Sequence, residues 1–345
     1  MSLIAYRLTF DAMILFSILI AITAGLAPMI VYALIVWWFD RYEKEPWPLL
    51  LATFVWGAVP SIILALIAEL VLDIPLHAFV EAGLTYQLLG SSLVAPLVEE
   101  LFKGLAVLAI FLLFYRRFDD MLDGVVYGSL AGFGFAAVEN VLYFLSTLGE
   151  RGTGAMFILI FLRAFLFGLN HAFFTSLTGI GFALARTSRS WAIKLTMPLL
   201  GFALAVTAHA IHNAGATLAS VTCFTLLLSL VSDWGGALVL LIIVILATVQ
   251  ERGWIVKHLA DEVQSGLITP KQYRVACSYL ERVAERIDAL FRGDVGRFFR
   301  LGKFYQMETL LAFRKYQLAA FGDEGGNRAE VERWRREVAA MQARL

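Results

Sequence analysis

The sequence is poor in charge and almost free of cysteine. Asp, Glu, Lys and Arg make up 16% of its 345 residues, whereas 60% are hydrophobic and the mean hydropathy is +0.76. This composition argues against an ordinary soluble domain and predicts an all-α polytopic membrane protein. The two cysteines, Cys223 and Cys277, lie far apart without a CxxC spacing. That argues against a disulfide framework and against a thiolate metal site.

The few charges are unevenly divided along the chain. Residues 251–345 hold 17 of the 28 Lys and Arg residues, together with 13 of the 28 Asp and Glu residues. The first 250 residues are therefore apolar and slightly acidic, and the remainder is basic. We expect a membrane domain over residues 1–250 and a soluble helical tail over residues 251–345.

The tail contains a recognisable helix start. Thr269-Pro270-Lys271-Gln272 has the pattern of a capping box with proline at the first helical position. It predicts an amphipathic helix that ends near Phe291. A second helical stretch is expected from Gly296 to Phe321.

Long apolar runs fill the rest of the chain. A hydrocarbon core about 30 Å thick is crossed by roughly 20 helical residues, and on that basis the sequence predicts seven spans. They cover Ala12–Trp38, Pro48–Leu72, Tyr86–Tyr115, Met121–Ser146, Gly154–Ala185, Ala192–Ala216 and Trp234–Val249. Residues 217–231 are apolar but short, so they form a re-entrant or interfacial segment or an eighth span.

Basic residues fall in alternate loops of this arrangement. The loops after the first, third and fifth spans contain Arg41, Lys44, Arg116, Arg117, Arg186, Arg189 and Lys194. The intervening loops contain only Arg151 among their Lys and Arg positions. By the positive-inside rule, the basic loops are cytoplasmic. Seven spans then place the N-terminus outside and the tail inside the cytoplasmic membrane.

Three glycines recur every four residues in the fourth expected span, at Gly124, Gly128 and Gly132. This spacing of small residues lets two helices approach to backbone contact. We expect a packing seam there.

The third expected span contains APLVEELFKG, in which Glu99, Glu100 and Lys103 interrupt an apolar run. A charge at the middle of a span costs roughly 2.5 to 3.5 kcal/mol, so this helix needs partners on its neighbours. Glu99 and Lys103 are four residues apart and can pair on one helix face. The next three spans carry further polar residues: Glu139, Asn140, Arg163, Asn170, His171, His209, His212 and Asn213.

These polar residues are expected to form one site. At about 1.5 Å of rise per residue, Glu99, Glu139, His171 and His209 all lie roughly 21 to 27 Å from the cytoplasmic ends of their spans. A glutamate with a histidine can take the proton from a water molecule. A second histidine with an asparagine can donate hydrogen bonds to an oxyanion. The cluster is therefore suited to peptide hydrolysis without a Ser or Cys nucleophile.

The same residues resemble a known family. The segments WWFDRYEKEPWP, APLVEELFKG, DGVVYGSLAGFGFAAVENVLY, HAFFTSLTGIGF and AHAIHN, in this order, are similar to those of the PrsW family of intramembrane proteases. That family is related to the CAAX prenyl proteases and their bacterial relatives. The resemblance covers most of the expected membrane domain.

The resemblance implies roles for individual residues. Glu99 or Glu100 would activate water with His171, and His209 with Asn213 would form the oxyanion hole. Glu139 matches the glutamate of the following helix and completes the catalytic set. The residues expected in supporting roles are Lys103, Asn140, Arg163 and His212.

The sequence leaves the use of a metal open. Glutamates and histidines could hold a divalent ion such as zinc, and the ligands would then be Glu99, Glu100, His171 and His209. However, the sequence contains no HExxH pair.

The function predicted from the resemblance is hydrolysis of a membrane-anchored protein within the lipid bilayer. The CAAX enzymes carry an arginine after their glutamate pair. Here Lys103 follows the pair and Glu139 is added, which favours protein substrates such as anti-sigma factors over prenylated ones. No nucleic-acid partner is expected.

The sequence leaves two alternatives to a protease. A proton-coupled transporter or channel could use the same buried Glu and His cluster, but no inverted repeat supports it. A scaffold without chemistry is disfavoured by the complete set of Glu, His and Asn residues.

Overall fold

The structure, a computed structural model, describes the backbone of residues 3–345 and the side chains from Met13 onward. All regular elements among these residues are helices, so the predicted all-α class is confirmed. The chain divides into two compact units. The membrane unit comprises the chain up to Trp38 and Glu45–Val244, and the tail unit comprises Phe39–Lys44 and Ile245–Leu345.

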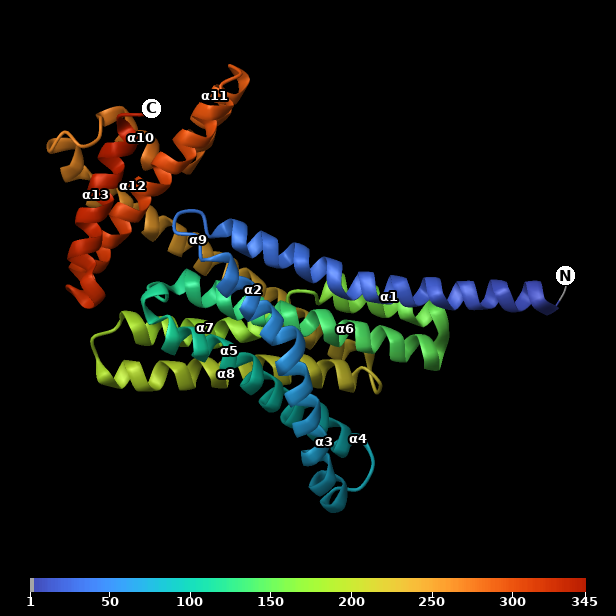
Figure 1. The fold of residues 1–345 in the computed structure, drawn as a ribbon. Coiled ribbons are helices and arrows are strands. Elements are labelled where there is room, and N and C mark those ends of the chain that lie inside the picture. The colour runs from blue at the N-terminus through green and yellow to red at the C-terminus, as the bar shows by residue number, and fades with distance from the viewer. Residues whose placement is uncertain (1–2) are drawn as a thin grey trace. The chain divides into compact units, whose positions relative to one another are not determined.

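The membrane unit is a bundle of helices joined by short turns. Its helices are α1 (Leu3–Phe39), α2 (Trp47–Trp56), α3 (Ile62–Phe79), α4 (Leu84–Leu89), α5 (Ala95–Leu113), α6 (Met121–Ile160), α7 (Asn170–Thr187), α8 (Trp191–Leu218) and the first part of α9 (Leu226–Gln264). Helices α6, α7 and α8 run side by side, and α5 packs against all three (Figure 1). Three wider, π-type segments interrupt the bundle: η1 (Gly57–Ser61), η2 (Gly90–Val94) and η4 (Phe161–Leu166).

Five helical stretches of the described chain are long and apolar enough to cross a membrane. They are Met13–Phe39, Trp47–Phe79, Met121–Thr187, Trp191–Leu218 and Cys223–Gln264. The protein is therefore a multi-pass membrane protein. The helical region from α4 to α5, which is the third expected span, is not in this set because it carries three charges. The count of seven spans stays a prediction.

The stretch Met121–Thr187 contains a reversal of the chain. Helix α6 begins at a reciprocal cap, in which Asp120 and Asp123 each accept a hydrogen bond from the other's backbone N–H. Gly152 has a φ of 78°, which favours glycine and breaks the helix direction. Beyond it, Arg163 Nε donates to Asn140 Oδ1 at 2.9 Å, although 23 residues of straight helix would separate the two by about 35 Å. The chain has therefore doubled back, as the fourth and fifth expected spans require.

The fifth expected span, Gly154–Ala185, is not one continuous helix. The segment η4 ends at Leu166, residues 167–169 form a turn, and α7 starts at Asn170. The apolar pattern could not show this break because the turn residues are themselves mostly apolar.

The undecided residues 217–231 do not form a helix of their own. Helix α8 ends at Leu218, a turn and the short η5 segment (Cys223–Thr225) follow, and α9 begins at Leu226. Their apolar character belongs partly to the first turns of α9. The expected span Trp234–Val249 lies wholly within that helix.

The three glycines of α6 form the expected packing seam against α7. A Cβ atom on Gly124 would lie 2.5 Å from the carbonyl oxygen of Gly179, and one on Gly132 would lie 2.3 Å from that of His171. Gly128 meets the backbone of Ser176 in the same way. The two backbones touch along this line, and the contact fixes His171 relative to α6.

The tail unit has its own apolar core. Its helices are the end of α9, α10 (Pro270–Ala276), α11 (Tyr279–Phe291), α12 (Val295–Phe321) and α13 (Asn327–Gln342). The predicted capping box is confirmed, because Thr269 and Gln272 exchange side-chain and backbone hydrogen bonds. The single helix expected to end near Phe291 was wrong: Cys277 and Ser278 separate α10 from α11, and Ser278 caps the second helix.

One carboxyl group lies inside the tail core. Glu308 on α12 is 0% exposed, and among the described residues neither of its oxygens has a hydrogen-bond partner. Burial raises the pKa of the Glu308 carboxyl to about 8, although the nearby Arg282 guanidinium opposes this rise. The group is therefore mostly protonated at neutral pH.

We expect Gly132→Ala to destabilise the membrane unit by about 1 to 3 kcal/mol, because the new methyl group has no room against His171. Thermal unfolding of the purified protein in detergent measures the loss. Gly149→Ala on the same helix is the control, since a Cβ there meets nothing within 4 Å. Equal melting temperatures for both variants would contradict the seam.

We expect the stability of the tail unit to fall as the pH rises. The folded pKa of Glu308, about 8, exceeds its ordinary value of 4.5, so the stabilisation is complete below pH 4.5 and is lost as the pH rises through 8. Hydrogen exchange of α12, corrected for intrinsic rates, should show less protection at pH 8.5 than at pH 5.5. Glu308→Gln should remove that difference. Glu337→Gln, at an exposed position on α13, should leave it unchanged.

Candidate active site

A cavity of about 540 Å³ lies in the membrane unit. Its wall comes from α3, α5, α6, α7 and α8 and from the segments η2 and η4. Aliphatic residues such as Ile62, Leu66 and Leu142 form part of the lining. The carboxylate, guanidinium, imidazole and amide residues that line it are Glu69, Glu99, Glu139, Arg163, Asn170, His171, His209, His212 and Asn213.

The glutamate pair of α5 divides between two environments. Glu99 is 6% exposed and lines the cavity. Glu100 is 0% exposed and does not line it. Its Oε2 accepts a hydrogen bond from Thr175 Oγ1 at 2.9 Å, and its Oε1 lies 3.0 Å from His209 Nδ1. Successive residues on a helix point about 100° apart, and only Glu99 therefore reaches the cavity.

Lys103 supplies the counter-charge for both carboxylates. Its ammonium is fully buried and lies 2.5 Å from Glu100 and 3.5 Å from Glu99. It also lies 3.1 Å from His171 Nδ1 and 4.4 Å from the centre of the Phe135 ring. The lysine is thus paired on all sides, which a buried charge requires.

His209 of α8 lies between the two glutamates. Its Nδ1 contacts Glu100, and its Nε2 lies 3.8 Å from Glu99. The ring stacks on Phe174, with centres 4.8 Å apart and an interplanar angle of 18°. These contacts fix the ring orientation and turn Nε2 toward the cavity side of α5.

His171, in the first turn of α7, is held by α6 as well as by Lys103. Its Nε2 lies 2.9 Å from Glu139 Oε2. Glu139 is also paired with Arg163, whose Nε donates to Asn140. The structure thus joins the supporting residues Arg163 and Asn140 to Glu139 and His171.

His212 and Asn213 lie farther along α8. Asn213 Nδ2 donates to the carbonyl oxygen of Ser91 at 2.7 Å, so one of its two amide hydrogens is committed and the other remains for the cavity. His212 Nε2 lies 3.4 Å from Asn170 Nδ2 on the cavity side. Its other nitrogen, Nδ1, pairs with Asp233.

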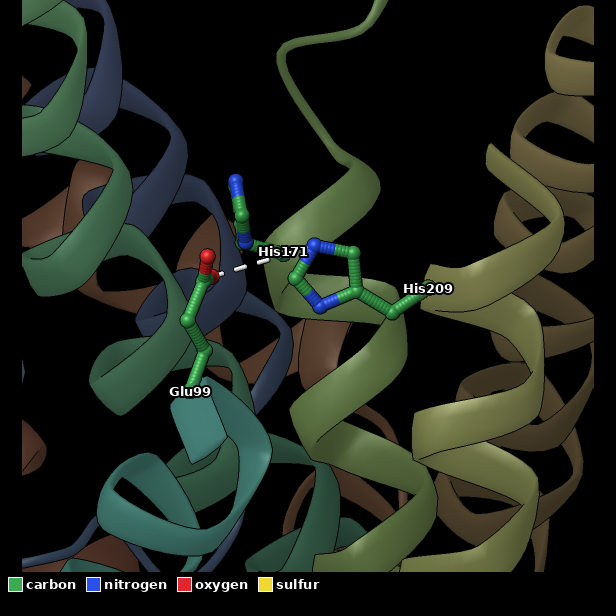
Figure 2. A group of neighbouring side chains, drawn as sticks. All are labelled: Glu99, His171 and His209. Atoms are coloured by element: carbon green, nitrogen blue, oxygen red, sulfur yellow. Dashed lines mark ion pairs between the residues drawn. The ribbon is translucent and has the colours of Figure 1, made fainter. Parts of the chain in front are cut away.

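Three of the four ligands considered from the sequence converge. Glu99, His171 and His209 each offer a ligand atom, and these atoms lie within 4.8 Å of one another. Figure 2 shows the three side chains pointing toward one another from three helices. Two imidazoles and one carboxylate form a donor set typical of catalytic zinc sites. The arrangement of Glu100 behind His209 matches the carboxylate that usually orients a zinc-bound histidine.

The charges around the cavity also fit a divalent cation. Glu69, Glu99, Glu100 and Glu139 carry four formal negative charges, and Lys103 and Arg163 carry two positive ones. The cluster is left with a formal charge of −2. A bound divalent cation would balance this excess.

Two acidic residues were missed in the sequence. Glu69 on α3 lines the cavity, and within the described part of the chain no hydrogen bond or ion pair holds it. It stands alone in the run IILALIAELVL, and a lone charge in a span is itself a functional signal. Asp233 lies one residue before the expected span Trp234–Val249.

A family model described as PrsW family intramembrane metalloprotease matches residues 45–255. The match therefore contains every residue described around the cavity. No solved structure matches the chain.

Three bacterial proteins, each named Protease PrsW, are similar to this chain. The protein from Oceanobacillus iheyensis is 29% identical over 215 residues, which are 60% of this chain and 87% of that protein. The Geobacillus kaustophilus protein is 30% identical over 165 residues, 48% of this chain and 66% of its own length. The Clostridioides difficile protein is 34% identical over 107 residues, which are 31% of this chain and 43% of that protein. The chain spans less than two thirds of the last two proteins.

We expect the purified protein to bind one zinc ion per chain, with His209→Ala abolishing binding. Glu100→Gln should weaken binding by about 10-fold to 100-fold, because it removes the charge that orients His209. Chelator competition measures the affinities. The control is Glu81→Gln, an exposed position outside the cavity. Unchanged zinc affinity in His209→Ala would contradict the assigned ligand set.

Proposed function

Because the chain belongs to the PrsW family of intramembrane metalloproteases, we propose that it hydrolyses a peptide bond of a membrane-anchored protein. The observation that carries this proposal is the convergence of Glu99, His171 and His209 at a cavity among the apolar helices. The family match supports peptide hydrolysis and gives no support to the transporter alternative.

Glu99, His171 and His209 would hold the metal. A divalent ion such as zinc, when bound, lowers the pKa of a coordinated water and polarises the substrate carbonyl. Glu100 and Lys103 contact these three residues without being ligands themselves. Glu100 orients His209 through Nδ1, and Lys103 balances the charge of the glutamate pair.

Glu139 is the residue best placed to take a proton from water. Glu99 is committed to the ligand set, and Glu100 is enclosed by Thr175, Lys103 and His209. Glu139 lines the cavity beside His171, and its side chain is 15% exposed. We assign it the role of general base.

Two side chains can donate hydrogen bonds to the oxyanion that forms when water adds to the peptide carbonyl. Arg163 lines the cavity with 22% of its side chain exposed, and Asn213 retains one amide hydrogen. The sequence prediction gave this task to His209 and Asn213, but both nitrogens of His209 face carboxylates. We assign the task to Arg163 and Asn213.

The proposed substrate is a membrane-anchored protein, for example an anti-sigma factor. The aliphatic part of the lining suits an apolar segment, and the polar part lies beside it. By the loop charges, the protein would lie in the cytoplasmic membrane with its tail inside.

We expect Glu139→Gln to lower cleavage by at least about 100-fold, which is the contribution of a general base, while zinc binding persists. New protein N-termini are compared in membranes from cells that make either form at matched levels. Cut sites in single-span proteins should appear with the wild type alone.

The control for this experiment is Glu150→Gln, an exposed position farther along α6, which should cleave like the wild type. The same cut sites with Glu139→Gln would refute the assignment of the base. If the wild type produces no cut sites under several stress conditions, the proposed protease activity is wrong.

A further inference from the structure

A second ionisable pair lies inside the membrane unit, away from the glutamate pair. Asp233 of α9 is 4% exposed and His212 of α8 is 7% exposed. Asp233 Oδ2 lies 2.7 Å from His212 Nδ1. Asp233 does not line the 540 Å³ cavity, so it does not touch a substrate there. Ionisable groups among apolar helices are costly and need an explanation.

The pair continues into a chain of polar contacts. His212 Nε2 lies 3.4 Å from Asn170 Nδ2, and Asn170 Oδ1 accepts the backbone N–H of His171 at 2.6 Å. The contacts therefore run from Asp233 through His212 and Asn170 to the backbone of a proposed metal ligand.

The donors and acceptors in this series of contacts are mutually compatible. Because Asn170 Oδ1 is an acceptor, its amide nitrogen faces His212 as a donor. His212 Nε2 then accepts, so Nδ1 carries the ring hydrogen, and the Asp233 carboxylate lies 2.7 Å from that nitrogen. Asp233 thus selects the tautomer of His212 that can hold Asn170.

These polar contacts end at the start of helix α7, and that position gives them a structural role. Residues 167–169 are not helical, and Asn170 and His171 form the first turn of α7. The first N–H groups of a helix lack partners within it. Asn170 satisfies one of these groups, and His212 keeps Asn170 in position.

We propose that Asp233 is a positioning residue, which fixes the orientation of His171 through His212 and Asn170. This inference rests on the proposed function for its link to metal binding. The positioning itself is a property of the fold.

The competing explanation is that the contact between Asp233 and His212 only clamps α8 to α9. Those helices have another contact, because Ser229 Oγ donates to the carbonyl oxygen of His212 at 2.7 Å. Ser229→Ala therefore weakens the same helix pair without changing the Asp233 contact. It is the matched control.

The test compares Asp233→Asn with Asp233→Leu, which are similar in size. Asparagine retains an oxygen that can accept from His212 Nδ1, whereas leucine does not. We expect zinc affinity to fall by about 10-fold to 100-fold in the leucine variant, and to stay within about 3-fold in the asparagine variant. Chelator competition on the purified full chain gives both values.

Hydrogen exchange of the metal-free protein gives an independent reading. Residues 167–175 should exchange faster in Asp233→Leu and should keep the wild-type rate in Asp233→Asn and Ser229→Ala. If the wild type bound no zinc, the proposed metal site would be wrong, and faster exchange limited to Asp233→Leu would still support positioning.

Two results would overturn the inference. One is wild-type exchange at residues 167–175 in a folded Asp233→Leu protein. The other is an equal change in Ser229→Ala, because a simple clamp between α8 and α9 would produce it.

Discussion

The buried ammonium of Lys103 is the interaction on which the membrane unit depends. It lies within 3.5 Å of Glu99, Glu100 and His171, which come from α5 and α7. Without this cation, adjacent carboxylates would face an apolar interior with no charge to balance them, a state that costs several kcal/mol. Lys103 therefore makes the glutamate pair compatible with a membrane helix, and it draws the start of α7 toward α5.

The glycine seam of α6 provides the matching steric constraint. Gly132 lets the backbone of α6 touch the carbonyl group of His171, so α7 can approach closely enough for His171 to reach both Glu139 and Lys103. Electrostatic pairing alone would hold flexible side chains loosely. Close backbone contact makes the distances definite, and a metal site needs ligands held that closely.

Much of the site could be predicted from the sequence because charge in an apolar run is costly and therefore informative. The interruptions at Glu99, His171 and His209 identified residues that the structure brings together. The sequence could not predict that Glu99 lines the cavity and Glu100 does not, since this depends on how α5 is rotated against its neighbours. The break after η4 could not be predicted, because hydropathy does not distinguish a turn made of apolar residues from a helix. Asp233 lay outside every expected span, so its contact with His212 had no signal.

The irregular backbone segments of the membrane unit lie around the cavity, and the cavity accounts for their being tolerated. In a bilayer, backbone groups outside regular helices are tolerated only where protein or water satisfies them. The π-type segments η2 and η4 both contribute residues to the cavity wall, and Ile62 follows directly after η1. The turn at residues 167–169 ends at Asn170, which also lines the cavity. Hydrolysis needs water in this cavity, and water can satisfy the groups that these interruptions expose. A fully regular bundle would satisfy these backbone groups within its helices, whereas here the irregular segments lie where water in the cavity can satisfy them.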